Sequence, residues 1–292
     1  MSVLEAILLG IVQGLTEFLP VSSSGHLAIF EQLLGVDTSG GILFDVLLHF
    51  GTLGAVVLVF RKDLVRLVLE TIRIIHDLWY NLVTLFHNLR DGEERRYRKI
   101  IDNNYRKFVV MILAATLPTA VIGYLMRGVA AAVSATLLFP ALGLLITGVL
   151  LLVVDYVETG KKIPKDVPIW NAFIIGACQG IAAFPGISRS GTTITACLLC
   201  GFNRKFAVKF SFIMSIPAII GAMILEIKGA VGSTAVTGSF VLCSMAGMIV
   251  AGVVGFLAIK TMLSMVQKKK LRVFAYYCFI VGIAAIVGSF LL

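Results

Sequence analysis

Long runs of apolar residues, separated by short polar stretches, dominate the chain. Six of these runs are long enough, or nearly so, to cross a bilayer as a helix of roughly 20 residues. Four contain no charged residue, the run at 43–60 holds Asp45 and His49, and the run at 206–225 holds Lys209. The predicted transmembrane helices are 43–60, 108–126, 133–154, 206–225, 238–259 and 273–292. The pattern therefore predicts an all-α integral membrane protein.

Two further apolar regions do not fit a simple span. Residues 10–29 read GIVQGLTEFLPVSSSGHLAI and residues 176–195 read GACQGIAAFPGISRSGTTIT, so each has a polar break containing Pro20 or Pro185. Proline, glycine and serine at membrane depth interrupt a helix, and the freed backbone groups need partners from protein or water. Two re-entrant helical hairpins satisfy this need. The predicted hairpins are 2–36 and 168–200.

These two regions repeat one another. At an offset of 166 positions without gaps, seven of the twenty residues are identical, including the Ser-x-Ser-Gly core. The identical positions are Gly10, Gln13, Gly14, Phe18, Ser22, Ser24 and Gly25, matched by Gly176, Gln179, Gly180, Phe184, Ser188, Ser190 and Gly191. The chain therefore divides into repeats at 1–154 and 168–292, each with one hairpin and three spans.

Basic residues gather in two segments between spans. Segment 61–107 holds eleven Lys or Arg against seven Asp or Glu, and segment 260–272 holds five basic residues and no acidic one. The positive-inside rule places both segments on the inner side. The first hairpin then enters from outside and the second from inside, and both termini lie outside. Since each half has three spans, the halves run antiparallel as an inverted-topology repeat.

Within segment 61–107, apolar residues recur at helical spacing from Leu64 to Leu89. Basic residues accompany them, a combination that is typical of helices lying in a membrane interface. We therefore predict an amphipathic helix on the inner surface.

Composition supports the membrane assignment. The chain is 59% hydrophobic and 14% charged, with a mean hydropathy of +0.99, whereas soluble domains carry about 25% charged residues. The net charge of +9 is explained by the inner loops, so no nucleic-acid partner is expected. All five cysteines lie in apolar segments, and the Cys197 and Cys200 pair lacks a second pair to complete a zinc site.

The differences between the hairpins point to chemistry. The first carries Glu17, Ser23 and His26, whereas the second has Ala, Arg and Thr at the matching positions, the arginine being Arg189. Ionisable groups at this depth are costly and usually functional. A buried ion pair that only holds the hairpins together would explain Glu17 and Arg189, but not the two Ser-x-Ser-Gly turns. We expect a site where the hairpins meet.

The residue types at this meeting place suit phosphoryl transfer. Serine-glycine turns that open helices bind anions, and Arg189 offers planar donors for phosphate oxygens. Gln13 and Glu17 are four residues apart on one helix face, so they can hold a hard cation such as Mg²⁺ or Ca²⁺. His26 suits proton transfer, and Ser23 can act as a nucleophile. An anion site, a metal and an acid/base together describe phosphoryl transfer.

Three segments, QGLTEFLP, VSSSGH and PGISRSG, resemble the signature segments of the bacterial undecaprenyl-pyrophosphate phosphatase family, the bacitracin-resistance type. The resemblance covers nearly the whole chain. It implies a metal-dependent phosphatase, multi-pass in the inner (plasma) membrane, whose site opens outward. Its substrate would be a polyprenyl pyrophosphate lipid, and its product the carrier lipid for cell-wall synthesis. Segment 61–107 looks like an insertion, and Gln13 stands where a scheme with two carboxylates needs a second one.

The same resemblance assigns roles to individual residues. Glu17, Ser23, His26 and Arg189 correspond to the essential residues of the family. The expected substrate contacts are Ser22, Ser24, Gly25, Ser188, Ser190, Gly191 and Thr193. Either Ser23 or His26 could attack phosphorus, and Ser23 with His26 as acid/base is the preferred assignment.

Several alternatives stay open at this point. Broken helices in an inverted repeat also occur in transporters, so a flippase for a phosphorylated polyprenyl lipid is the second hypothesis. Gly247, Gly252 and Gly255 allow close helix packing, either within one chain or in a homodimer. Asp45 and His49 lie near the first hairpin as supports of the site or as a solvated cap.

Overall fold

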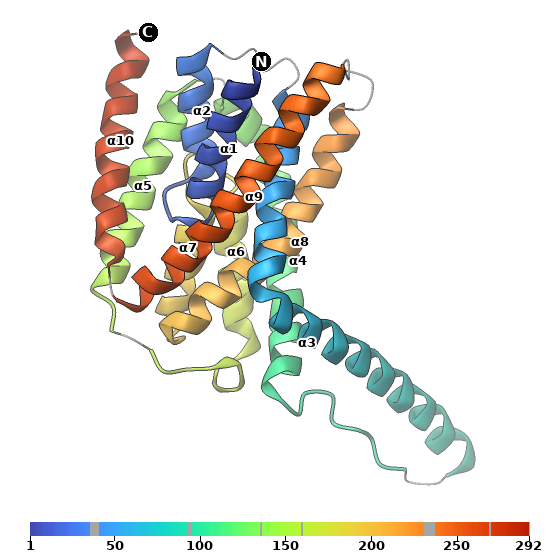
Figure 1. Ribbon diagram of the computed structural model, residues 1–292. Coiled ribbons are helices and arrows are strands. Elements are labelled where there is room, and N and C mark those ends of the chain that lie inside the picture. The colour runs from blue at the N-terminus through green and yellow to red at the C-terminus, as the bar shows by residue number, and fades with distance from the viewer. Residues whose placement is uncertain are drawn as a thin grey trace.

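A computed structural model describes residues 1–35, 41–92, 95–134, 136–158, 160–230, 237–268 and 270–291 (Figure 1). Within these ranges the protein is helical and has no β-strand, which confirms the predicted fold class at this level. The long helices are α3 (Gly41–Asp91), α4 (Asn104–Val133), α5 (Leu138–Asp155), α8 (Arg204–Ala230), α9 (Gly238–Gln267) and α10 (Leu271–Leu291). The shorter ones are α1 (Val3–Phe18), α2 (Ser23–Leu34), η2 (Pro164–Asp166), α6 (Ile169–Ile181) and α7 (Arg189–Leu199).

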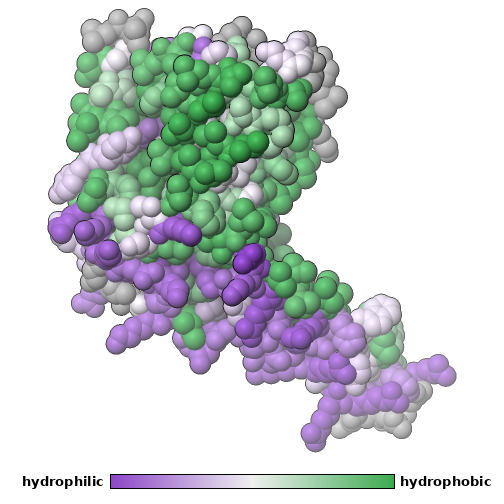
Figure 2. All heavy atoms as spheres, in the orientation of Figure 1, coloured by the Kyte–Doolittle hydropathy of each residue, from purple (hydrophilic) through white to green (hydrophobic). Residues whose placement is uncertain are grey.

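The long helices form a multi-pass membrane bundle. Five of those described, α4, α5, α8, α9 and α10, are long and apolar enough to span a bilayer, and the bent α3 adds a sixth if it is counted. Apolar side chains cover the face of the bundle shown in Figure 2, above a polar lower end. Each predicted span falls on one helix, although Val133 ends α4 and α5 begins at Leu138.

The two predicted hairpins are pairs of short helices. The pair α1 and α2 lies toward the end of the bundle that carries both termini, whereas α6 and α7 lie toward the opposite end (Figure 1). The break in the first pair is capped by Ser22, whose side chain accepts a hydrogen bond from the Gly25 N–H. Ser188 caps α7 in the same way, accepting from the Gly191 N–H. The repeated Ser-x-x-Gly spacing therefore produces the same N-cap twice.

Helices of the first repeat pack against helices of the second repeat. Helix α1 lies along α9, α6 lies along α4, and α5 lies along α10. A Cβ on Gly10 would lie 2.6 Å from the Gly247 carbonyl oxygen, and a Cβ on Gly176, the matching residue, would meet the Ala115 carbonyl. These glycines let helix backbones touch, as small residues do in membrane bundles. Gly247, Gly252 and Gly255 all pack against α1 or α3 of the same chain, so their presence needs no second copy.

Helix α3 leaves the bundle halfway along its length. Phe60 has non-helical dihedral angles (φ −100°, ψ 17°), and the helix axis bends there by 84°. Residues 61–91 form an arm that projects from the bundle, and residues 95–103, the strap, run back along it to α4 (Figure 1). The predicted inner segment 61–107 thus comprises the arm, the strap and the first turn of α4.

Candidate functional site

The tips of the two short-helix pairs touch each other. The Gly186 N–H donates to the Ser24 hydroxyl at 3.3 Å, and the Ser190 hydroxyl donates to the Leu19 carbonyl at 3.3 Å. Ser24 and Ser190 are matching residues of the repeat. Gly186 has φ 83°, a conformation that favours glycine and lets the second tip turn toward the first. The reciprocal contact brings together the residues in which the two repeats differ.

Glu17 lies at the centre of this contact. It sits in the last turn of α1 and is buried. One carboxylate oxygen, Oε2, accepts hydrogen bonds from the Ser23 hydroxyl at 2.7 Å and from Gln13 Nε2 at 3.1 Å. The other oxygen, Oε1, accepts from Arg189 Nη2. Glu17, Ser23 and Arg189 are therefore brought together, as the sequence predicts.

The pairing also explains how a carboxylate can be buried here. A charge taken out of water is stabilised only when opposite charge and hydrogen bonds surround it. Arg189 supplies the opposite charge from the first residue of α7. Its side chain keeps 21% of its surface exposed, and the neighbouring Ser24 is exposed as well. The site is therefore not fully enclosed at Arg189 and Ser24.

His26 lies on α2, as Ser23 does, but its side chain contacts a different partner. Its Nδ1 lies 2.8 Å from the Ser22 carbonyl, to which it donates, so Nε2 is the acceptor for the Tyr277 hydroxyl at 2.8 Å. The planes of the two rings are nearly parallel, at 5°, and the ring centroids are 5.6 Å apart. Tyr277 comes from α10 and was not identified from the sequence, where an aromatic residue in an apolar span looks like a membrane-interface side chain.

His49 approaches Glu17 from α3. Its Nδ1 donates to the Asp45 carbonyl at 2.8 Å, which leaves Nε2 facing Glu17 Oε2 at 3.7 Å. The His49 side chain is 32% exposed. Of the two residues suggested as supports of the site, His49 therefore reaches it through its side chain and Asp45 through its backbone.

The predicted substrate contacts differ in their exposure and in their hydrogen bonds. Ser24 is exposed, whereas Ser22, Gly25, Ser188, Ser190, Gly191 and Thr193 are buried. The hydroxyl groups of Ser22 and Ser188 are engaged as helix caps. The Thr193 hydroxyl donates to the Arg189 carbonyl at 2.8 Å and lies 2.5 Å from the Ser211 hydroxyl. Thr193 therefore packs α7 against α8 in this arrangement.

The oxygen-bearing side chains of Gln13 and Glu17 are the ones that the sequence predicts as ligands of a cation. Gln13 is fully buried, and its Oε1 has no hydrogen-bond partner among the described residues. The matching Gln179 has the same unpartnered atom, so the feature comes with the repeat. The described ranges contain no cluster of three or more His, Cys, Asp or Glu side chains arranged for a metal. The residues present fit a cation that also takes ligands from a bound anion and water.

Comparison with known proteins identifies the family. The family described as bacitracin resistance protein BacA matches residues 6–284. An undecaprenyl-diphosphatase of Alkaliphilus metalliredigens is 41% identical over 292 residues, covering 100% of both chains. Undecaprenyl-diphosphatases of Methanosphaera stadtmanae and Rubrobacter xylanophilus are each 39% identical, over 100% of this chain and 100% and 99% of theirs. The chain thus belongs to the bacitracin resistance protein BacA family.

Proposed function

We infer that this protein is an undecaprenyl-diphosphatase, which hydrolyses undecaprenyl pyrophosphate to undecaprenyl phosphate and phosphate. Family membership over residues 6–284 supports this activity, as do the relatives of the same length. The product would serve as the carrier lipid of cell-wall synthesis. Lipid transport without cleavage, the second hypothesis from the sequence, has no support in the names of these relatives.

The contact of Glu17 with both Ser23 and Arg189 is the observation on which the mechanism rests. Arg189 would bind the terminal phosphate with its planar pair of donors. Ser24 and the N–H groups in the first turns of α2 and α7 would add further donors, since such groups have no partner within the helix. Because Glu17 holds Arg189 in the structure, the substrate has to take the place of Glu17 on the guanidinium.

Ser23 is the proposed nucleophile. Its hydroxyl already donates to Glu17, so Glu17 can accept the proton as the Ser23 oxygen forms a bond to the terminal phosphorus. The bond from that phosphorus to the bridging oxygen breaks, and undecaprenyl phosphate leaves. Water then attacks phosphoserine, the Glu17 carboxyl returns its proton to the Ser23 oxygen, and phosphate is released. The loss of the Arg189 contact makes Glu17 a stronger base at the moment when the substrate is bound.

His26 and His49 would assist from opposite sides. His26, held by Ser22 and Tyr277, lies one helical turn from Ser23, and its acceptor Nε2 would take a proton from the water that attacks phosphoserine. His49 would keep Glu17 in place after Arg189 has turned to the phosphate. We assign Glu17, Ser23, His26 and Arg189 as catalytic residues and His49 as a positioning residue.

A divalent cation, Mg²⁺ or Ca²⁺, is proposed as the cofactor. Gln13 Oε1 and Glu17 would hold it together with phosphate oxygens of the substrate, because hard cations prefer oxygen ligands. When bound, such an ion neutralises charge that develops on the transferring phosphoryl group.

The inverted repeat and its orientation are also part of the proposal. The packing of α1 along α9 and of α6 along α4 is the pattern expected if 1–154 and 168–292 are related by a two-fold axis in the membrane plane. The hairpins would then be re-entrant, the site would open to the outer face of the plasma membrane, and both termini would lie outside. The basic arm and strap support this orientation.

Phosphate release from undecaprenyl pyrophosphate by the purified protein tests the function. We expect release with Mg²⁺ or Ca²⁺ and its loss in EDTA. Glu17→Gln should lower kcat by about 10²–10⁴-fold, since it removes the general base, and Arg189→Ala should lower kcat/KM to a similar extent. Thermal unfolding checks that both variants fold. If the folded wild type binds the lipid but releases no phosphate with either metal, the hydrolase assignment is wrong.

A further inference from the structure

The arm of α3 carries a continuous ridge of exposed apolar side chains. They recur every three or four residues on one face of the helix, and each keeps between 46% and 66% of its surface exposed. The ridge consists of Val65, Val68, Ile72, Ile75, Trp79, Val83 and Phe86. Seven exposed apolar side chains on one face of a helix in water would promote aggregation, so this face is expected to be an interaction surface.

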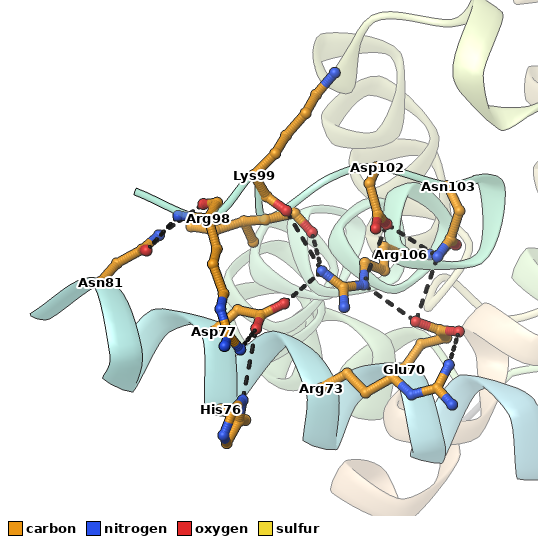
Figure 3. A network of polar contacts seen from close by, with 11 residues as sticks. Glu70, Arg73, His76, Asp77, Asn81, Arg98, Lys99, Asp102, Asn103 and Arg106 are labelled. Atoms are coloured by element: carbon orange, nitrogen blue, oxygen red, sulfur yellow. Dashed lines mark hydrogen bonds and ion pairs between the residues drawn. The ribbon is translucent and has the colours of Figure 1, made fainter. Parts of the chain in front are cut away.

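The opposite face of the arm is occupied by the strap. Asn81 forms two hydrogen bonds with the backbone of Arg98, at 2.7 and 2.8 Å. Arg106 at the start of α4 donates to Asp77 at 2.7 Å and to Glu70 at 3.1 Å (Figure 3). This clamp fixes the rotation of the arm about its own axis. The polar face of the arm therefore packs against the strap and the start of α4. The ridge lies on the opposite face, away from the strap.

The bend at Phe60 sets the direction of the arm. Its axis makes an angle of 84° with Leu43–Val59, the part of α3 that lies in the bundle. If Leu43–Val59 crosses the bilayer, the arm runs close to the membrane plane. The strap lies on the underside of the arm, away from the apolar part of the bundle, and apolar side chains continue from the bundle onto the arm (Figures 1 and 2). The exposed Val57 and Leu58 make this connection just before the bend.

We propose that residues 61–91 form an interfacial anchor, with the ridge immersed at the boundary between headgroups and acyl chains of a phospholipid bilayer. A helix with one apolar face and basic flanks binds there through buried apolar area and attraction to lipid phosphates. Arg61 and Lys62, exposed at the start of the arm, would contact those phosphates. The bilayer is favoured over a second copy of the chain because the ridge continues the lipid-facing surface of the bundle. Through Arg106, the anchor would fix the tilt of α4.

Trp79 is a built-in reporter for this proposal. The chain has two tryptophans, and Trp170→Phe leaves only Trp79, which is 66% exposed in the protein alone. The full-length variant is reconstituted as single copies in lipid nanodiscs, with or without acyl chains brominated near the headgroup. We expect a blue-shifted emission, of which roughly half or more is lost to the brominated lipid, because the ridge would sit about 5–10 Å deep.

A second reporter on the strap provides the matched control. Tyr97 is 55% exposed and lies on the strap, beyond the polar face of the arm. Tyr97→Trp, combined with Trp79→Phe and Trp170→Phe, should emit as in water, respond to iodide and ignore the brominated lipid. The proposal is wrong if Trp79 behaves like this control. It is also wrong if Trp79 is shielded from iodide but insensitive to brominated lipid, since protein rather than lipid would then cover the ridge.

Discussion

The Arg189 guanidinium lies against Glu17, so the cation suited to a phosphate is neutralised by a carboxylate of the same protein. This arrangement compensates the buried charge of Glu17 and the half-buried charge of Arg189. It also makes phosphate binding an exchange, in which Arg189 leaves Glu17 and Glu17 keeps Ser23, Gln13 and His49 as neighbours. Binding and activation of the base are thereby coupled, because the same movement frees the carboxylate.

Replacement of His49 tests this exchange at a single residue. We expect His49→Ala to lower kcat about tenfold, equivalent to about 1.4 kcal/mol, with little change in KM, since it removes the imidazole whose Nε2 lies 3.7 Å from Glu17 Oε2. His49→Gln, which keeps a donor near the carboxylate, should recover much of that loss. Steady-state phosphate release measures both variants. His76→Ala on the arm is the control, and equal losses in His49→Ala and His49→Gln would exclude a positioning role.

Some residues of the site can be predicted from the sequence and others cannot, for reasons that differ between residues. Glu17, Ser23 and Arg189 stand out because the repeats match around them and differ at them. The partner of His26 does not, since Tyr277 lies 251 positions away on a helix whose residues otherwise read as lipid-facing. The burial of Thr193 depends on the side-chain direction in α7 and on Ser211 of α8, neither of which a motif specifies.

Among the helices, the arm departs most from its sequence prediction. The amphipathic pattern from Leu64 to Leu89 predicts the helix, but nothing at Phe60 predicts an 84° bend, since neither proline nor glycine is present. Tertiary contacts at the bend account for it. Phe60 packs edge-on against Phe212, and Asp63 pairs with Lys209 at 2.7 Å. Both partners belong to α8, so the direction of the arm is set by a helix of the other repeat.

The clamp between the arm and α4 should open in acid. Hydrogen bonds from Arg106 and Arg98 lower the pKa of Asp77 from its ordinary value of 3.8. A carboxylate with a lowered pKa stabilises the folded state above its unfolded pKa, and this contribution is lost as the pH falls through the folded pKa. The strap should therefore stay bound at neutral pH and detach only as the pH falls below 3.8, through the lowered pKa of Asp77.

Hydrogen exchange of the strap amides measures this release. We expect protection of residues 95–103 to fall progressively as the pH is lowered below 3.8, after correction for the intrinsic exchange rate. Asp77→Asn should produce the same loss at pH 7, whereas Asp102→Asn, whose carboxylate is about half exposed (51%), should not. A strap that stays protected at pH 7 in Asp77→Asn would show that the clamp does not hold it.

Gly176 is one of two α6 glycines in close contact with α4, the other being Gly180. A Cβ on Gly176 would meet the Ala115 carbonyl, whereas Gly123, also within α4, has nothing within 4 Å. Gly176→Ala should therefore destabilise the protein by about 1–3 kcal/mol through overpacking, with a lower Tm in detergent. Gly123→Ala should be neutral or stabilising by up to about 1 kcal/mol, because alanine favours helix. Equal Tm values for the two variants would contradict the proposed packing.

The basic arm and strap predict how the whole protein is oriented in the membrane. Both termini lie at the opposite end of the bundle (Figure 1), and α4 leads from the strap to Ser134 at its far end. Because basic loops stay on the inner side of the membrane, Ser134 should face outward with the termini, and Tyr97 should face inward. The tips of α1 and α2 then approach from outside, which is where a phosphatase that recycles carrier lipid on the outer face needs its opening.

Cysteine labelling tests this orientation directly. The five native cysteines, which are free and buried or half-buried, would be replaced by alanine, and Ser134→Cys or Tyr97→Cys added to a variant that still releases phosphate. In intact cells, a membrane-impermeant maleimide should label Ser134→Cys, whereas Tyr97→Cys should react only after permeabilisation. The reverse pattern would place the arm outside and the site on the inner face. Labelling of both positions in intact cells would mean that the chain inserts in two orientations, and a single outward-facing site would then be excluded.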